Sequence, residues 1–361
     1  MKYYSDFYKT VDSDENAYFI GANTPRGFAY ADPSLTDERN YKRLYIIKGG
    51  PGTGKSSMMK KCREHFEEPG AKVTSYYCSS DPDSLDAVII EKNGISIAIA
   101  DGTSPHALDA SLPGAVSEII NLGEYWDSPA LQKKYDAIAK ASAEKTLAFD
   151  SSRRYLAAAD EILSTLRKVS ANGFEENKAA GFIGRLISTL PRQRSKAERK
   201  TFITEAISMK GAFRLPTFEA AGTVFGIVPH AHLAPIFLEK LSYELERAGH
   251  SQHVSYSPLG EITEIHLPLA DTAFVPVRCG MVYDKLIRLS RFADKEYFSG
   301  NMAKRRFNER CLLEVLDGAL ASLAEAKKYH FALEDIYISA MDFNGIDEVC
   351  KRLIGEIEYC L

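Results

Sequence analysis

A glycine-rich loop between an apolar segment and an amphipathic one constrains the fold of this 361-residue chain more than any other feature. The loop, Gly49–Ser56, reads GGPGTGKS and directly follows the apolar run Leu44–Lys48. Behind it, apolar residues recur at helical spacing: Met58, Met59, Cys62 and Phe66. This pattern predicts a buried strand, a tight loop and a helix, an arrangement whose helix N-terminus attracts anions.

Each residue type in this loop suits the binding of phosphate groups. Glycines let successive backbone N–H groups approach phosphate oxygens, and Pro51 stiffens the turn between them. Lys55 can neutralise the terminal phosphates, while the Ser56 hydroxyl can ligate Mg²⁺. A glycine turn without a ligand is the alternative interpretation. The expected nucleotide-binding residues are Gly49, Gly50, Pro51, Gly52, Thr53, Gly54, Lys55, Ser56 and Ser57.

A second apolar run, Ile95–Ala100, ends at Asp101 and predicts a strand buried on both faces. The loop and this acid together resemble the Walker A and Walker B motifs of the P-loop NTPases. That resemblance implies a parallel sheet with flanking helices, a nucleoside triphosphate as ligand and Mg²⁺ held by Ser56 and Asp101. It also implies catalytic roles for Lys55 and Asp101. The alternative for Asp101 is an acid that caps the following turn.

Three further acids lie between the two motifs, in the loop after a predicted strand at Lys72–Cys78. Asp81, Asp83 and Asp86 should lie near the phosphate end, because ligands bind at the carboxyl edge of an open α/β sheet. Ordinary turn and cap chemistry is the alternative for all three. The turn Lys92–Gly94 also allows a local hairpin in place of a helical crossover, which leaves the strand order open.

The residues after Asp101 offer no obvious general base, since GTSPH follows where a glutamate would be expected. His106 could serve as the base, although a surface histidine is the plainer interpretation. An arginine that contacts the transferring phosphate is a further possibility, with solvated surface positions as its alternative. The candidates are Arg153, Arg154, Arg192 and Arg194. No guanine-binding motif is present, since Asn177–Ala180 fails at its fourth position, and ATP is therefore the expected nucleotide.

The chain carries an internal repeat whose second copy has lost these motifs. A shift of 179 residues sets Met58 on Phe237 and Phe66 on Leu245, so apolar positions coincide. The same shift replaces Lys55 by Ala234, and a shift of 177 replaces Asp101 by Arg278. Five histidines of this half could form a metal cluster, but ordinary loop positions are the favoured interpretation because no carboxylate or cysteine accompanies them at ligand spacing. These histidines are His230, His232, His250, His253 and His266.

Each copy is followed by a helix-forming extension, and a basic segment joins the two halves. We expect an α/β fold with a mostly parallel P-loop NTPase-type sheet, duplicated, each copy followed by a helical extension. The predicted division of the chain is an active P-loop domain at 1–127, a helical extension at 128–190, a linker at 191–200, a degenerate repeat at 201–290 and a second helical extension at 291–361.

The whole arrangement resembles a bacterial family of ATPase-like proteins built from two P-loop repeats. The resemblance is carried by the GGPGTGKSS loop, by DGTSPH at Asp101–His106 and by PGAVSEIINLGEYWD at Pro113–Asp127. It covers most of the chain and is far more specific in the first half. No assigned activity accompanies it, and the altered second half argues against a mechanism with two ATP sites.

Composition excludes several classes of protein. The formal net charge of −4 gives no overall basic field, so nucleic acid is not indicated as a partner. No apolar run approaches the roughly 20 residues that cross a bilayer, and the first residues lack a secretory or transit pattern. The six cysteines show no C-x-x-C spacing, so reduced thiols and a cytoplasmic location are expected.

These features predict an ATP-binding, Mg²⁺-dependent NTPase, either a slow ATPase or a nucleotide switch, with one active and one degenerate site. The helical extensions could engage a protein partner. A small-molecule kinase, in which Asp81, Asp83 or Asp86 accepts a proton from a substrate hydroxyl, is the first alternative. A scaffold protein that is only stabilised by nucleotide is the second.

Overall fold

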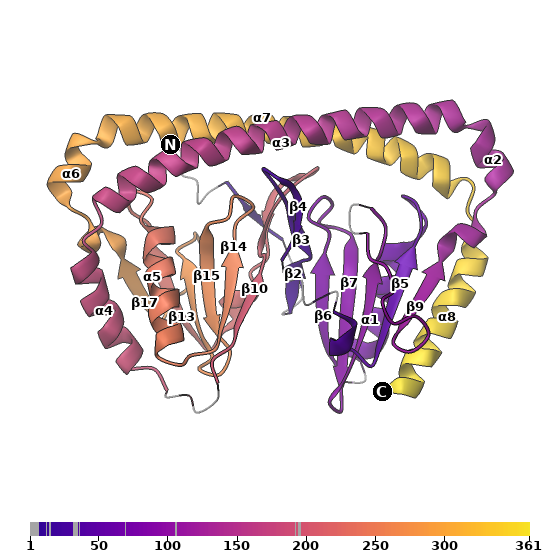
Figure 1. Ribbon diagram of the computed structural model, residues 1–361, viewed down its shortest axis with the longest axis horizontal. Helices are drawn as coiled ribbons and strands as arrows, with labels where there is room; N and C mark the ends of the chain where they lie inside the picture. Colours follow the sequence, from indigo (N-terminus) through magenta and orange to yellow (C-terminus); the bar gives the residue numbers. More distant parts are fainter. Residues whose placement is uncertain are drawn as a thin grey trace.

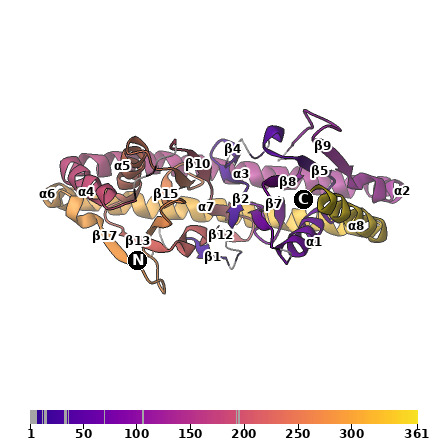
Figure 2. The ribbon, with the colours of Figure 1, turned by 90° about the horizontal axis from the view of Figure 1, so that it is seen from below.

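The computed structural model describes residues 7–361 except 12, 14–15, 32–34, 36, 69, 105–106, 192 and 194–195. Two α/β lobes lie side by side beneath a pair of long helices that spans both of them (Figure 1). Figure 2 shows from below that this helix pair runs along the length of the molecule. Among the described residues, no helix has an apolar stretch long enough to cross a membrane.

The first lobe is built on a six-stranded sheet of order β2-β6-β7-β8-β5-β9. Only β7 runs against the other strands. Helix α1 (Lys55–Glu67) buries its apolar stripe against one face of the sheet, where Met59 and Cys62 are fully buried. The strands are β2 (Ala17–Phe19), β5 (Arg43–Lys48), β6 (Lys72–Tyr77), β7 (Leu85–Lys92), β8 (Ile95–Asp101) and β9 (Ser117–Asn121).

The second lobe contains a sheet of order β10-β14-β15-β16-β13-β17, in which only β15 runs against the other strands. Strand order and strand directions therefore coincide in the two sheets. Helix α5 (Ala234–Arg247) packs on the second sheet through Phe237 and Leu241. The strands are β10 (Arg199–Phe202), β13 (Thr223–Val228), β14 (Gln252–Tyr256), β15 (Ile262–Leu267), β16 (Thr272–Pro276) and β17 (Lys285–Arg288).

The expectation of an α/β fold with flanking helices is confirmed, and each sheet is mixed, with one antiparallel strand among otherwise parallel ones. The antiparallel strand of the first sheet follows from the turn between β7 and β8. There Asn93 and Gly94 have φ of 53° and 78°, as a tight hairpin turn requires. The hairpin that was the alternative for this turn is therefore the one observed. In addition, β10 begins at Arg199, two residues inside the expected linker.

Two helices of nearly 40 residues form the layer above both lobes. Helix α3 (Tyr135–Asn172) contains neither Pro nor Gly, and it pairs along its length with α7 (Met302–Ile338). Leu156 and Leu163 of α3 share one buried cluster with Leu316 and Leu323 of α7. The shorter helices at their ends are α2 (Ser128–Lys133), α4 (Glu176–Ser188), α6 (Lys295–Gly300) and α8 (Phe343–Cys360).

Each half of the chain gives its last helix to the lobe of the other half. Helix α4, which ends the first half, packs Ile183 into the core of the second lobe beside α5. Helix α8, at the C-terminus, packs Leu353 into the core of the first lobe beside α1. Figure 1 shows α4 and α8 on the outer sides of opposite lobes. The two cores are therefore each completed by both halves.

Short elements join the lobes between the sheets. Strand β1 (Lys9–Thr10) pairs with β12 of the second half, and the Phe19 N–H donates to the Ile203 carbonyl at 2.9 Å. The hairpin β3–β4 contacts the hairpin β11–β12. These strands are β3 (Gly21–Thr24), β4 (Gly27–Tyr30), β11 (Glu205–Ser208) and β12 (Gly211–Arg214), and the 3₁₀ turns are η3 (Glu38–Asn40), η4 (Leu122–Tyr125), η5 (Thr217–Ala220) and η6 (Leu289–Phe292).

Candidate functional site

The glycine-rich loop lies between β5 and α1, as the sequence predicts. Gly52 and Gly54 have φ of 69° and 87°, a left-handed conformation that disfavours residues with a Cβ. A Cβ on Gly52 would also lie 2.9 Å from the carbonyl oxygen of Glu334 in α7. The loop therefore needs glycine both for its own path and for the close approach of α7.

Lys55 begins α1 and turns back over the loop. Its Nζ donates to the carbonyl oxygens of Gly49 and Gly50, at 3.1 Å and 2.7 Å, and lies 3.7 Å from Asp101 Oδ2. The side chains of Lys55 and Asp101 are 13% and 11% exposed. Next along the helix, Ser56 Oγ accepts a hydrogen bond from the Leu85 N–H at 2.9 Å, which fixes its position.

Asp101 ends β8 and is held beside the loop. Its Oδ1 accepts from the Thr103 N–H at 2.8 Å, and Thr103 Oγ1 donates to the Gly49 carbonyl at 2.9 Å. Burial raises the pKa of Asp101, and Asp86 adds to this, while Lys55 and Thr103 oppose the rise. The net pKa lies above the ordinary value, so the carboxylate depends on nearby cations or donors for its charge.

The three acids of the loop after β6 take different places. Lys210 of the second half binds both Asp81 and Asp83, and the Asp83 side chain is 75% exposed. Asp86 is buried and lines the same cleft as Lys55 and Asp101. The turn interpretation suits Asp81, which accepts from the Asp83 N–H at 3.2 Å, whereas Asp86 and Asp81 both line the cleft beside the glycine-rich loop.

A cleft of about 820 Å³ lies between the glycine-rich loop and the two long helices. Its floor includes Pro51, Gly52, Thr53, Gly54, Lys55, Ser56 and Ser57 with Asp86 and Asp101. Its roof comes from α3 and α7, and charged or ionisable roof residues are Lys145, Asp150, Arg153, His330 and Glu334. The second half of the chain therefore supplies part of the wall around the first half's loop.

The roof includes one candidate residue from the sequence analysis, Arg153, and several residues that the sequence did not indicate. Arg153 lines the cleft and pairs with Asp150 at 3.0 Å, whereas Arg154 is not among the residues that line it. His106, Arg192 and Arg194 lie outside the described residues. Lys145, His330 and Glu334 carry no motif. For His330 and Glu334 the available sequence signal is their spacing, because residues four positions apart on a helix lie next to each other.

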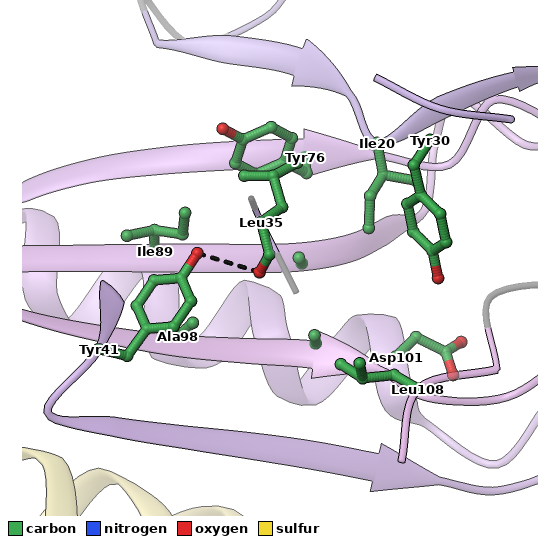
Figure 3. Close-up of a pocket in the computed structure, with 11 residues that line it drawn as sticks. Ile20, Tyr30, Leu35, Tyr41, Tyr76, Ile89, Ala98, Asp101 and Leu108 are labelled. Carbon is green, nitrogen blue, oxygen red and sulfur yellow. Dashed lines mark hydrogen bonds between the residues drawn. The ribbon is translucent and has the colours of Figure 1, made fainter. Parts of the chain in front are cut away.

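Asp101 also borders a second, much smaller cavity on the other side of the sheet, of about 20 Å³. Figure 3 shows Asp101 at one end of it, together with aromatic and aliphatic side chains. Tyr41 closes the other end by donating its hydroxyl to the Leu35 carbonyl at 3.1 Å. A space of this size accommodates one water molecule, so the larger cleft is the candidate ligand site.

The corresponding loop of the second lobe, between β13 and α5, is tied down by its own side chains. His232, with φ of 57°, contacts Glu261 at 2.8 Å, and Arg167 of α3 binds the same carboxylate oxygen at 2.8 Å. Ser170 donates to the Ala231 carbonyl at 2.7 Å. Burial raises the pKa of Glu261, but His232 and Arg167 together bring it below its ordinary value.

At the edge of the second sheet, Arg278 follows β16 where Asp101 ends β8. Arg278 lies 3.0 Å from Glu264 and 3.7 Å from Glu205, and both glutamates are buried. Burial raises the pKa of each of these glutamates to about 8. This edge therefore carries a cation where the first lobe carries an acid.

No protein-family model, curated protein or solved structure matches the chain. Within the described ranges, no three His, Cys, Asp or Glu side chains are grouped so that they could hold a metal ion by themselves.

Proposed function

We propose that this chain is an ATP-binding, Mg²⁺-dependent P-loop NTPase, a slow ATPase or nucleotide switch whose one active site is the cleft of the first lobe. The observation that carries the proposal is the position of Lys55 and Asp101, 3.7 Å apart at the N-terminus of α1 and on the floor of this cleft. The volume of about 820 Å³ lies in the usual range for small-molecule sites.

Phosphate binding would use the backbone of the loop as well as Lys55. The first N–H groups of α1 have no acceptor inside the helix, and the helix dipole favours negative charge at that end. Lys55 now donates to two loop carbonyls, and a phosphate oxygen is a stronger, charged acceptor for the same amine. These groups would stabilise negative charge on a transferring phosphoryl group.

The donor atoms in the cleft fit Mg²⁺. The Ser56 hydroxyl and the carboxylates of Asp101 and Asp86 are oxygen donors on the cleft wall. Mg²⁺ is usually held by one or two carboxylates together with substrate phosphates, which suits a site without a full protein cage. We assign Ser56 and Asp101 to the ion, with Asp86 as an additional acid. When bound, Mg²⁺ would offset charge on the phosphate oxygens.

We further infer that the two lobes are copies of one P-loop-type unit. Their identical strand order and strand directions support this, as does the equivalent placement of α1 and α5. The second copy has Ala234 and Arg278 at the positions of Lys55 and Asp101, and Glu261 ties down its loop. It would therefore act as a partner of the active lobe and bind no nucleotide.

Slow turnover is expected because neighbouring basic side chains engage several carboxylates of the cleft. Asp81 is bound by Lys210, Asp150 by Arg153 and Glu334 by His330. An ion-paired carboxylate is a weaker base than a free one, since the cation stabilises its charged form. These paired carboxylates are consequently poor general bases for activating the attacking water.

A small-molecule kinase is the second candidate, and the placement of Asp86 favours it. Asp86 lines the cleft beside Asp101, and the cleft continues past the loop to Asn23, Phe28 and Met209. A substrate hydroxyl lodged there could transfer its proton to Asp86 as it takes up the phosphoryl group. Phosphate release from ATP without an added acceptor supports the NTPase, and absence of release despite ATP binding supports the kinase.

The proposal is tested by calorimetric titration of the full chain with ATP and Mg²⁺. Lys55→Ala should weaken ATP binding at least about 10-fold, since a charge-assisted hydrogen bond contributes about 1.5–3 kcal/mol. Lys42→Ala, at an exposed position, is the matched control and should bind as the parent does. Absence of ATP binding by the parent, or undiminished binding by Lys55→Ala, would overturn the proposal.

A further inference from the structure

The roof of the cleft carries a cation, Lys145, that forms no ion pair with any residue that the structure describes. Lys145 of α3 is half-buried, and it lines the same cleft as Lys55. Within the part of the chain that the structure describes, the Lys145 amine makes no ion pair and no hydrogen bond. Burial lowers the pKa of Lys145, Lys55 lowers it further and Glu334 partly opposes both. The positive charges of Lys145 and Lys55 therefore repel each other.

The other ionisable roof residues differ from Lys145 in being paired. Arg153 lies 3.0 Å from Asp150, and His330 lies 3.5 Å from Glu334 on the same helix. Lys145 thus stands out as the roof cation with its hydrogen-bonding capacity unused. Three N–H donors on a partly desolvated amine need acceptors, and leaving them unsatisfied is unfavourable.

Two like charges that face one cleft are stabilised by an anion placed between them. Lys55 and Asp101 mark the end of the cleft where a terminal phosphate and its metal would lie. Lys145 lines this same cleft from the α3 side, together with Lys55 and Asp101. An anion between floor and roof would meet a charged donor from each side.

We propose that Lys145 binds the terminal phosphate of a nucleoside triphosphate from the roof, opposite Lys55, and makes the cleft selective for triphosphates over diphosphates. The inference deepens the proposed function and rests on it. Lys55 and the loop amides would hold the inner phosphates of both nucleotides, whereas Lys145 would gain its acceptor only when the third phosphate is present. Lys145 is a binding and specificity residue that comes from the crossing helix of the same chain.

The test compares ADP with a non-hydrolysable ATP analogue, both with Mg²⁺, by titration calorimetry. Lys145→Met should weaken binding of the triphosphate about 10-fold or more and leave ADP affinity within about 3-fold, because one charge-assisted contact is lost. Lys145→Arg retains the charge and should restore most of the preference. Lys140→Met, at an exposed position of the same helix, is the matched control and should change neither affinity.

The Lys145→Met variant should fold as the parent does, since methionine is a good helix former and no ion pair is removed. Thermal unfolding checks this, and Lys145→Gln repeats the loss of charge with a polar side chain. Equal weakening of both nucleotides, or no weakening of either, would overturn the inference. If the parent binds both nucleotides and Lys55→Ala binds neither, the proposed function survives that failure. If the parent binds neither nucleotide, both proposals are wrong.

Discussion

Lys55 Nζ lies 3.7 Å from Asp101 Oδ2, although 46 positions separate the two residues in the chain. The contact arises because β5 and β8 are neighbouring parallel strands, with Ile47 opposite Asp101. Parallel strands end at the same edge of a sheet, so a loop that follows one strand meets the last residue of the other. This relationship ties the glycine loop to the acid and underlies the predictions below.

Asp101→Asn should make ATP binding nearly independent of Mg²⁺. The substitution keeps the shape of the side chain and removes the charge that would hold the ion's water shell. Loss of such an outer partner typically lowers metal affinity about 10- to 100-fold. Titration of ATP with Mg²⁺ and with a chelator measures the effect. Asp109→Asn, at a solvent-exposed acid, is the control. A full Mg²⁺ effect in Asp101→Asn would remove Asp101 from the metal site.

Gly52→Ala should destabilise the fold and separate the loop from α7. An alanine at φ of 69° costs about 1–2 kcal/mol, and its Cβ would lie 2.9 Å from the Glu334 carbonyl oxygen. Gly94→Ala is a matched control, because Gly94 has φ of 78° with open space around it. Urea denaturation should show the larger loss for Gly52→Ala. Equal losses would mean that the contact with α7 contributes nothing.

The local features of the first lobe could be predicted from the sequence because they are encoded by neighbouring residues. The strand, glycine loop and helix at 43–67 depend on periodicity and on glycine, and they fall where expected. The hairpin at Asn93 could be listed only as an alternative, because a short turn and a crossover leave similar apolar runs on either side.

The roof of the cleft could not be predicted, because it depends on contacts between distant parts of the chain. Lys145 and Glu334 lie on helices whose surface patterns look like ordinary solvated faces. Nothing in the periodicity of α8 shows that its apolar stripe packs on α1 and not on its own half. Asp81 and Asp86 both follow β6 in one polar segment, so the sequence does not distinguish them. Only the tertiary structure shows that Asp81 pairs with Lys210.

Stability should fall as pH rises towards 8, through the glutamates beside Arg278. Burial raises the pKa of Glu264 and of Glu205 from 4.5 to about 8. The folded state therefore retains protons that the unfolded chain has lost. This contribution is complete below pH 4.5 and is lost as pH rises through the folded-state pKa. Glu264→Gln keeps the neutral form at every pH.

Urea midpoints at pH 6, 7 and 9 for the parent and for Glu264→Gln measure this contribution. The variant should lose less stability than the parent between pH 6 and pH 9. Subtracting the stability change of the variant from that of the parent removes the contribution of groups that titrate equally in both proteins. A parallel decline in the two proteins would show that Glu264 is ionised in the folded state at neutral pH.

One nucleotide should bind per chain, because side chains hold the second loop closed. Glu261 is 3% exposed and is bound by both His232 and Arg167. Glu261→Gln should cost about 1–3 kcal/mol of unfolding free energy, since it weakens two charged contacts. ATP affinity should be unchanged, because this loop belongs to the other lobe. Calorimetry that finds two nucleotides per chain would contradict the assignment of an inactive second site.

Neither half of the chain should fold by itself. A chain cut after Leu190 would lack α8, so the face of α1 that meets Ile346 and Leu353 would be exposed to water. Burying one such side chain contributes about 1.5–3 kcal/mol, and α8 buries five residues in this core. Circular dichroism and dye binding should show a partly ordered state with exposed apolar surface. Addition of the separate piece 191–361, which contains α8 and itself lacks α4, should restore cooperative unfolding. Cooperative unfolding of 1–190 alone would show that the exchanged helix is dispensable for the first lobe.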